Sequence, residues 1–298
     1  MYKYYNKDDY HVMHYYFDSI TEYLNYVKDA PISNAFQNTS LDSEASGEYS
    51  WYKTHNLEEA KDMAKYGYHE DFDKFMELKF ELEKYIKISQ KKSKQYNFYV
   101  GYAPDVKAYL EGCPLNMLNK ENPPRKQVDI YYNAAILGDV DANQIFNRGV
   151  VTLSIVEILE KLGYSVNLNI FSMSEDGSQI HHAVFRLKDT TERVNAQKLF
   201  FPMCHPSFHR RLVFKLREVT PDITTSWTWG YGKTCSENTI RKIIDLNKND
   251  IVICRPDEMN VHGNDLIEDA NSMFEYINNE NNEKDFELPH LQKVKTLY

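Results

Sequence analysis

The residues best suited to chemistry lie in one stretch, ILGDVDANQIFNRG, at residues 136–149. Asp139, Asp141 and Asn143 stand two positions apart there, so a tight loop can turn their side-chain oxygens toward one point. Because Ca²⁺ and Mg²⁺ bind through several oxygen ligands, this spacing predicts a divalent-cation site, with Asp257 after a later apolar strand as a further ligand. The other interpretation, which we favour, is that Asp141 or Asn143 caps the helix that follows.

Two known loop types do not fit the sequence. An EF-hand needs Gly at its sixth position and Glu at its twelfth, where this chain has Gln144 and Val150. The segment GYGKT is not a phosphate-binding loop, because that motif requires a Gly where Trp227 stands. We expect an aromatic loop instead, in which Trp227, Trp229 and Tyr231 contact a partner.

The segment CHPSFHRR contains Cys204, His205 and His209, which are residue types that bind zinc. His181 and His182 are further candidates if the fold brings them near. Structural zinc sites usually show paired ligands at tight spacing, and no second pair is present. A cysteine beside a histidine is also the combination used for nucleophilic catalysis. The alternative is a buried thiol with two histidines that bond to the backbone.

The densest basic stretch of the chain is HRRLVFKLR. Arg210, Arg211, Lys215 and Arg217 can bind a nucleic-acid backbone by charge, with nearby aromatic residues to stack on bases. The alternative is a strand or a helix with one solvated face. The whole chain has a formal net charge of -9, which does not attract nucleic acid in general.

The composition is that of a globular protein with 23 tyrosines, which suit both cores and contact surfaces. Its four cysteines include no Cys-x-x-Cys pair, so we expect reduced thiols. The first residues contain no apolar segment typical of a secretory signal, and no run of 18 apolar residues exists. These features predict a cytoplasmic protein without a membrane span.

The elements that position these residues fall into three parts. Residues 1–96 are expected to be a helical N-terminal region, and residues 279–298 a polar tail. Residues 97–278 are expected to form an α/β domain with a doubly wound, mostly parallel sheet. Within it, the order of strand QVDIYYNAAIL, helix ANQIFNRGVVTLSIVEILEKLGY and strand SVNLNIFSM predicts a βαβ unit.

Three segments carry a resemblance to a known group of proteins. They are YSWYKTHNLEEAKDMAKYGYHEDFDKF, GYAPDVKAYLEGCPLNML and NRGVVTLSIVEILEKLGYSVNL. Together they resemble an uncharacterised family of tailed-bacteriophage proteins over most of residues 48–175. The resemblance implies a location in the cytoplasm of an infected bacterial host, and it implies no particular activity.

The α/β part also resembles the von Willebrand factor A-type fold. That fold binds a divalent cation through an Asp-x-Ser-x-Ser loop after its first strand and an Asp after a later strand. Asp139, Asp141 and Asn143 follow the strand at 127–136, and Asp257 follows the strand at 250–255. Neither serine of the motif is present, so the resemblance implies a degenerate domain. We therefore expect no cofactor, and a divalent cation at this loop is the one alternative.

The sequence contains no complete catalytic motif. We therefore expect a non-enzymatic phage protein that acts through protein–protein interaction with a phage or host protein, in host takeover or as an assembly accessory. One alternative is a nucleic-acid-binding accessory protein that uses the basic patch at residues 205–217. A further alternative is a metal-dependent enzyme.

Overall fold

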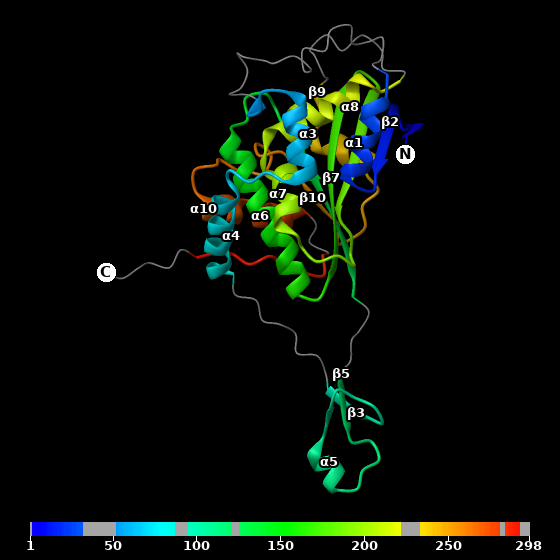
Figure 1. The fold of residues 1–298 in the computed structure, drawn as a ribbon, viewed down its shortest axis with the longest axis vertical. Coiled ribbons are helices and arrows are strands. Elements are labelled where there is room, and N and C mark those ends of the chain that lie inside the picture. The colour runs from blue at the N-terminus through cyan, green and yellow to red at the C-terminus, as the bar shows by residue number, and fades with distance from the viewer. Residues whose placement is uncertain are drawn as a thin grey trace, which may run out of the picture.

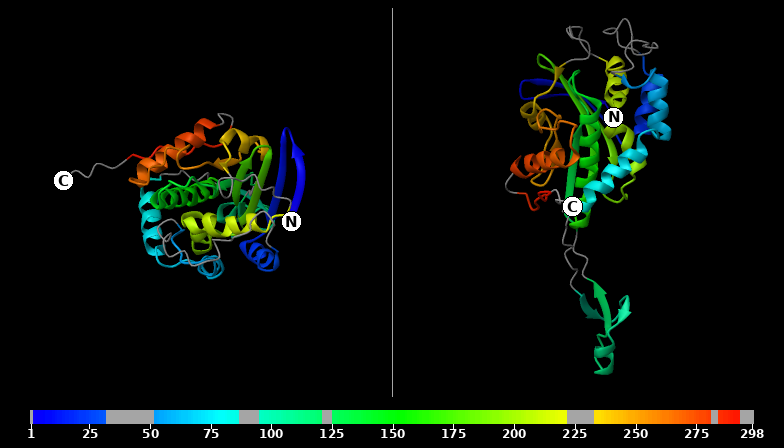
Figure 2. Two further views of the ribbon diagram at one scale, coloured as in Figure 1. Left: turned by 90° about the horizontal axis from the view of Figure 1, so that it is seen from above. Right: turned by 90° about the vertical axis from the view of Figure 1, so that its left-hand side faces the viewer.

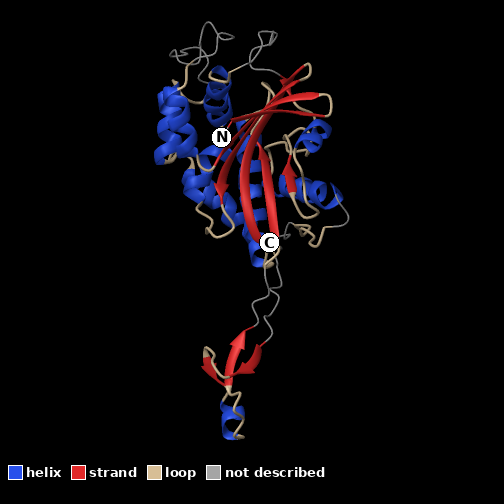
Figure 3. Cartoon of the chain, turned by 90° about the vertical axis from the view of Figure 1, so that its right-hand side faces the viewer, coloured by secondary structure: helices blue, strands red, loops and turns tan. Residues whose placement is uncertain are grey.

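A mixed β-sheet forms the centre of the protein (Figures 1 and 3). The structure is a computed structural model, and it describes residues 2–31, 52–86, 95–120, 125–221, 233–280 and 284–292. The strand order in the sheet is β1-β2-β8-β7-β6-β10, and the short strand β9 also pairs with β7. The fold is therefore mixed α/β, and its sheet contains antiparallel as well as parallel pairs.

The strands of the central sheet are β1 Tyr2–Lys7, β2 Tyr10–Phe17, β6 Gln127–Asn133, β7 Ser165–Asp176, β8 Gln179–Lys188, β9 Lys233–Thr234 and β10 Ile251–Ile253. Pairs β2/β8, β6/β7 and β6/β10 are parallel, whereas β1/β2, β7/β8 and β7/β9 are antiparallel. The expectation of a mostly parallel sheet is thus only partly met, because two hairpins bring antiparallel neighbours into it.

Helices cover both faces of this sheet. They are α1 Ile20–Asp29, α3 Leu57–Tyr66, α4 Phe72–Tyr85, α6 Ala142–Lys161, α7 Ala196–Cys204, the π-helical turn η1 Phe208–Val213, α8 Phe214–Glu218, α9 Glu237–Ile243 and α10 Leu266–Glu280. In the right-hand view of Figure 2, the gold and orange helices α9 and α10 lie on one side of the green strands. The blue and cyan helices α1, α3 and α4 lie on the other side. No helix within the described residues is long and apolar enough to cross a membrane.

The predicted βαβ unit is confirmed. Strand β6 leads into helix α6, and the chain returns in β7, which pairs with β6 in parallel. Helix α6 is buried from Ile145 to Leu159 almost without interruption, because other helices pack around it. Gly149 permits the close packing of α7, since a Cβ at this position would collide with Cys204 Sγ and lie 2.9 Å from the Met203 carbonyl oxygen.

The N-terminal part differs from the expectation that residues 1–96 are helical. Strands β1 and β2 form a hairpin whose turn places Asp8 at a φ of 52°. Strand β2 then pairs in parallel with β8 and extends the central sheet. The side chain of Lys7 fixes this hairpin to the end of α9, because its Nζ donates to the Ile243 carbonyl oxygen at 3.1 Å.

Residues 95–120 form a small lobe of their own. Strands β3 Gln95–Phe98, β4 Ala103–Pro104 and β5 Met117–Lys120 make a separate antiparallel sheet in the order β3-β5-β4, with helix α5 Val106–Leu110 between β4 and β5. Figure 1 shows this lobe apart from the central sheet. The expected α/β domain at 97–278 therefore contains a segment whose strands pair only with one another.

The predicted polar tail is partly docked. Leu288 and Leu291 are buried against the main body. The Asn278 side chain accepts from the Leu288 amide at 2.8 Å and donates to the Leu288 carbonyl oxygen at 2.9 Å. Asn271 holds Leu291 in the same way. Residues 284–292 thus lie along α10 as a clamped extended segment.

Candidate functional site

The lobe of residues 95–120 carries most of the large hydrophobic side chains that are exposed in the described part of the chain. Among the described residues, eleven large hydrophobic side chains are exposed, and seven of them belong to this lobe. The seven are Phe98, Tyr99, Val100, Tyr102, Val106, Tyr109 and Leu110. Leu110 is 78% exposed, which is far more than a leucine in a packed helix. A concentration of this kind marks a surface that contacts another molecule.

Hydrogen bonds of the Asp105 side chain give the lobe a defined shape. Asp105 caps helix α5, because its Oδ1 accepts from the amides of Lys107 at 3.1 Å and Ala108 at 3.2 Å. The other oxygen of Asp105 accepts from Asn97 Nδ2 at 2.9 Å, which joins the cap to strand β3. The Asn97 bond and the cap lower the pKa of Asp105. The exposed side chains of the lobe are therefore presented on an ordered frame.

The predicted cation loop is a helix cap. Asp141 is the N-cap of α6, and its Oδ1 accepts from the Asn143 amide at 2.7 Å. The Gln144 side chain accepts from the Asp141 amide at 2.9 Å, which completes a capping box. Asp139 is exposed in the loop before the cap. The structure therefore favours the capping alternative for this stretch.

Asp257 lies in an ion pair. Its Oδ2 is 3.1 Å from a terminal nitrogen of Arg255, which also pairs with Glu258. Among the described residues, no group of three or more His, Cys, Asp and Glu side chains is arranged to hold a metal ion. Asp139, Asp141 and Asp257 therefore do not form such a group, and neither do Cys204, His205 and His209.

The predicted basic patch is not a surface. The alternation in HRRLVFKLR belongs to the turn η1 and helix α8, and Arg210, Arg211, Lys215 and Arg217 are all buried. Arg211 lies over the Tyr52 ring at 3.9 Å and donates to the Thr54 carbonyl oxygen at 3.1 Å. A nucleic-acid backbone needs exposed cations, so these four side chains do not form the expected interface.

Cys204 and its neighbouring histidines are packed into the core. Burial raises the pKa of the Cys204 thiol well above its ordinary value, so the thiolate needed by a nucleophile is disfavoured. The Ser207 amide donates to His205 Nδ1 at 3.2 Å, and the His205 ring packs edge-on against Tyr68. Burial lowers the pKa of His205 to about 4. For Cys204 and His205, this arrangement matches the alternative of a buried thiol beside a histidine that bonds to the backbone.

Sequence reasoning missed a cluster of buried cations around His209. Arg148 from α6 and Arg217 from α8 are each 1% exposed. Burial, followed by the charges of Arg217, Arg210 and Arg148, lowers the pKa of His209 well below its ordinary value. The run of basic residues HRRLVFKLR indicated a concentration of positive charge in this segment, but it did not indicate that these side chains are buried.

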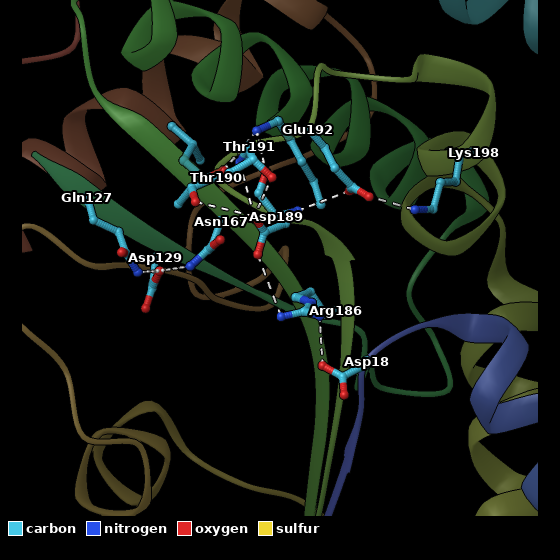
Figure 4. Close-up of polar contacts among 12 residues, drawn as sticks. Asp18, Gln127, Asp129, Asn167, Arg186, Asp189, Thr190, Thr191, Glu192 and Lys198 are labelled. Carbon is cyan, nitrogen blue, oxygen red and sulfur yellow. Dashed lines mark hydrogen bonds and ion pairs between the residues drawn. The ribbon is translucent and has the colours of Figure 1, made fainter. Parts of the chain in front are cut away.

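A second polar cluster lies at the opposite ends of the strands (Figure 4). Arg186 on β8 pairs with Asp18 after β2 at 2.8 Å and with Asp189 at 3.6 Å. The Thr191 amide and hydroxyl also donate to Asp189, and these bonds lower its pKa. Each carboxylate already has donors, so this cluster joins strand ends and offers no chemistry of its own.

The aromatic residues Trp227, Trp229 and Tyr231, predicted to contact a partner, lie outside the described residues. The exposed lobe was not singled out from the sequence. Its alternation of tyrosine with small and apolar residues is typical of a strand. This pattern does not distinguish a strand that is covered by a core from one whose side chains are exposed.

Neither a search of curated proteins nor a search of solved structures gave a match. A comparison with protein families matched residues 4–281 to one described as a domain of unknown function, DUF7192. The match includes both sheets and all the described helices. The chain therefore belongs to the DUF7192 family.

Proposed function

We propose that this protein is of bacteriophage origin and acts in the bacterial host cytoplasm by binding another protein, of phage or host. The observation that carries the proposal is the exposed apolar surface of the lobe at residues 95–120. Binding then takes place through this lobe, and the central sheet with its helices acts as the support.

The energetics of the lobe support this role. Ala108 is the one buried hydrophobic residue in its described part, so its aromatic side chains contribute little to a core. Tyrosine and phenylalanine supply large contact areas and lose few side-chain rotamers on binding. Covering such side chains releases about 25 cal/mol for each Å² of apolar surface removed from water. The lobe therefore obtains from a partner the free energy of apolar burial that its own small core does not supply.

We extend the proposal to the fold of the main body, as a degenerate von Willebrand A-type core. In support, β10 pairs in parallel with β6, so the loops after these two strands lie at the same edge of the sheet. This is the relation that the resemblance implies for the loops that contain Asp141 and Asp257. The hairpin of β1 and β2 would then be an addition to that core.

The test is a double substitution on the exposed face of α5, Tyr109→Ala with Leu110→Ala. Each side chain is more than half exposed, so the fold is expected to tolerate the change. Truncation of a hot-spot contact residue costs about 1–2 kcal/mol, so the two changes together cost about 2–4 kcal/mol, and the affinity for the partner from infected cells should fall roughly 30- to 1000-fold. The measurement is a quantitative pull-down with the full chain as bait.

Tyr66→Ala with Phe80→Ala provides the matched control. These side chains are exposed to a similar degree, but they lie on α3 and α4 in the main body. The control should recover the partner as well as the unchanged chain does. The proposal fails if the unchanged chain recovers no protein partner, or if the two double variants bind equally well.

A further inference from the structure

Arg148 is a buried cation with neutral partners. Its Nε donates to the Tyr132 hydroxyl at 3.1 Å, and its Nη1 donates to the Cys254 carbonyl oxygen at 2.8 Å. The guanidinium also lies over the Tyr132 ring, 4.4 Å from its centre. No described carboxylate forms an ion pair with it. A charge removed from water in this way costs several kcal/mol unless a counter-charge lies nearby.

A small cavity lies beside this guanidinium. Its wall comes from the end of β6 and the residues just after it, from α6, from the end of α7, and from the start of η1 with the residues that join α7 to η1. The polar part of the wall consists of Tyr132, Arg148, His205 and His209, and the remainder is aliphatic, methionine or proline. The cavity volume is about 10 Å³, so the site is suited to a very small ligand. No carboxylate lines it.

His209 supplies an unused polar atom to this wall. The side chain is 5% exposed, and its Nδ1 has no hydrogen-bond partner among the described residues. A neutral imidazole can hold its proton on Nδ1 and donate from there. His205 differs, because its Nδ1 already accepts from the Ser207 amide. The cavity is therefore lined by one cation without an ion-pair partner in the described part of the chain, Arg148, and by one histidine, His209, whose Nδ1 is free to donate a hydrogen bond.

We propose that this cavity is a binding site for a small monovalent anion, which in a cell is chloride. Arg148 supplies the opposite charge, and His209 supplies a second donor through Nδ1. Phosphate, sulfate and carboxylate ligands contain several heavy atoms and do not fit the volume. A water molecule fits and can satisfy His209, but it leaves the charge of Arg148 uncompensated. The site stands apart from the lobe and does not depend on its function.

The test compares thermal unfolding in sodium chloride and in sodium gluconate at equal ionic strength and pH. An anion that binds only the folded chain raises the unfolding midpoint by mass action. We expect a rise of roughly 5 °C when chloride increases from far below to about 100 times its dissociation constant. Arg148→Met should abolish this rise. Arg186→Gln is the control, because Arg186 pairs with Asp18 at the surface, and it should keep the rise.

A direct measurement covers the case in which Arg148→Met does not fold. Crystals of the unchanged protein grown in sodium bromide should show an anomalous peak in the cavity between Arg148 and His209. The proposal is overturned if the cavity contains only water, or if chloride and gluconate give the same midpoint for the unchanged chain. It is also overturned if Arg148→Met responds to chloride as strongly as Arg186→Gln.

Discussion

Asp141 has a structural task at the start of α6. Its carboxylate accepts a backbone hydrogen bond, and its own amide donates to the Gln144 side chain. Two backbone donors that a helix leaves unsatisfied are thereby paired. The negative charge also lies at the positive end of the helix dipole. Asp139, only two residues earlier, is exposed and does not occupy the N-cap position.

These two aspartates provide the first prediction. Asp141→Ala should lower the free energy of unfolding by about 1 kcal/mol, because the side-chain half of the capping box is lost. Asp139→Ala should change it by less than about 0.5 kcal/mol. Urea unfolding of the three chains measures both values. Equal losses from the two substitutions would show that the loop does more than cap the helix.

At the scale of elements, the C-terminal segment shows how side chains can replace a strand partner. Asn271 and Asn278 lie two turns apart on α10, and each bonds to both the amide and the carbonyl of one leucine. Leu288 and Leu291 are held with their side chains against the core as a result. The clamp allows a segment rich in charged and polar residues to adopt one position.

The second prediction concerns this clamp. Asn278→Ala removes both hydrogen bonds to Leu288 and should lower the free energy of unfolding by about 1–3 kcal/mol. Residues near 288 should also exchange their amide hydrogens faster. Asn279→Ala serves as the control, because Asn279 is exposed on the same helix. If Asn278→Ala exchanges no faster than Asn279→Ala, the clamp does not hold the segment.

The sequence predicts some of these elements well and others poorly, for physical reasons. Strands β6 and β7 and helix α6 are buried, so their apolar runs have a clear length and period. The hairpin of β1 and β2 has tyrosine, histidine and lysine in most positions, and such residues do not indicate burial. The run at 208–218 alternates like a strand because buried arginines occupy positions in a helix that are normally apolar.

The candidate site shows the same limit. Residue spacing located the turn before α6, and it favoured a helix cap while leaving a cation loop as a second interpretation. Whether the loop can bind a cation depends on whether Asp257 lies close to Asp141. In the structure, the Asp257 carboxylate forms an ion pair with Arg255 instead. The exposure of the lobe depends on which strands pair with which, and local pattern contains no such information.

At the scale of the whole molecule, charge is divided between the interior and the surface. The formal net charge is -9, yet Arg148, Arg211 and Arg217 are almost fully buried. An acidic surface therefore encloses a basic interior. The histidines that share this interior are kept neutral, because burial lowers the pKa of His181, His182 and His209 well below the ordinary value.

This division predicts how stability changes with acid. Burial lowers the pKa of His14 and of His205 to about 4, whereas an unfolded histidine has a pKa of about 6.5. Between these two pKa values, the histidines are protonated in the unfolded chain and neutral in the folded chain. The free energy of unfolding should therefore have its full value above about pH 7 and should decrease as the pH drops through 6.5 toward 4. For His205 alone, the loss at about pH 5 is roughly 2 kcal/mol.

Urea unfolding at about pH 7.5, 6.5 and 5, at constant chloride, measures this slope. His205→Gln should make the dependence on pH shallower by close to one proton, because glutamine does not titrate. His262→Gln is the control for the removal of a histidine at an exposed position. A stability that stays flat between pH 7.5 and 5 would mean that the buried histidines accept protons inside the folded chain. In that case the buried histidines are not held neutral in the folded chain.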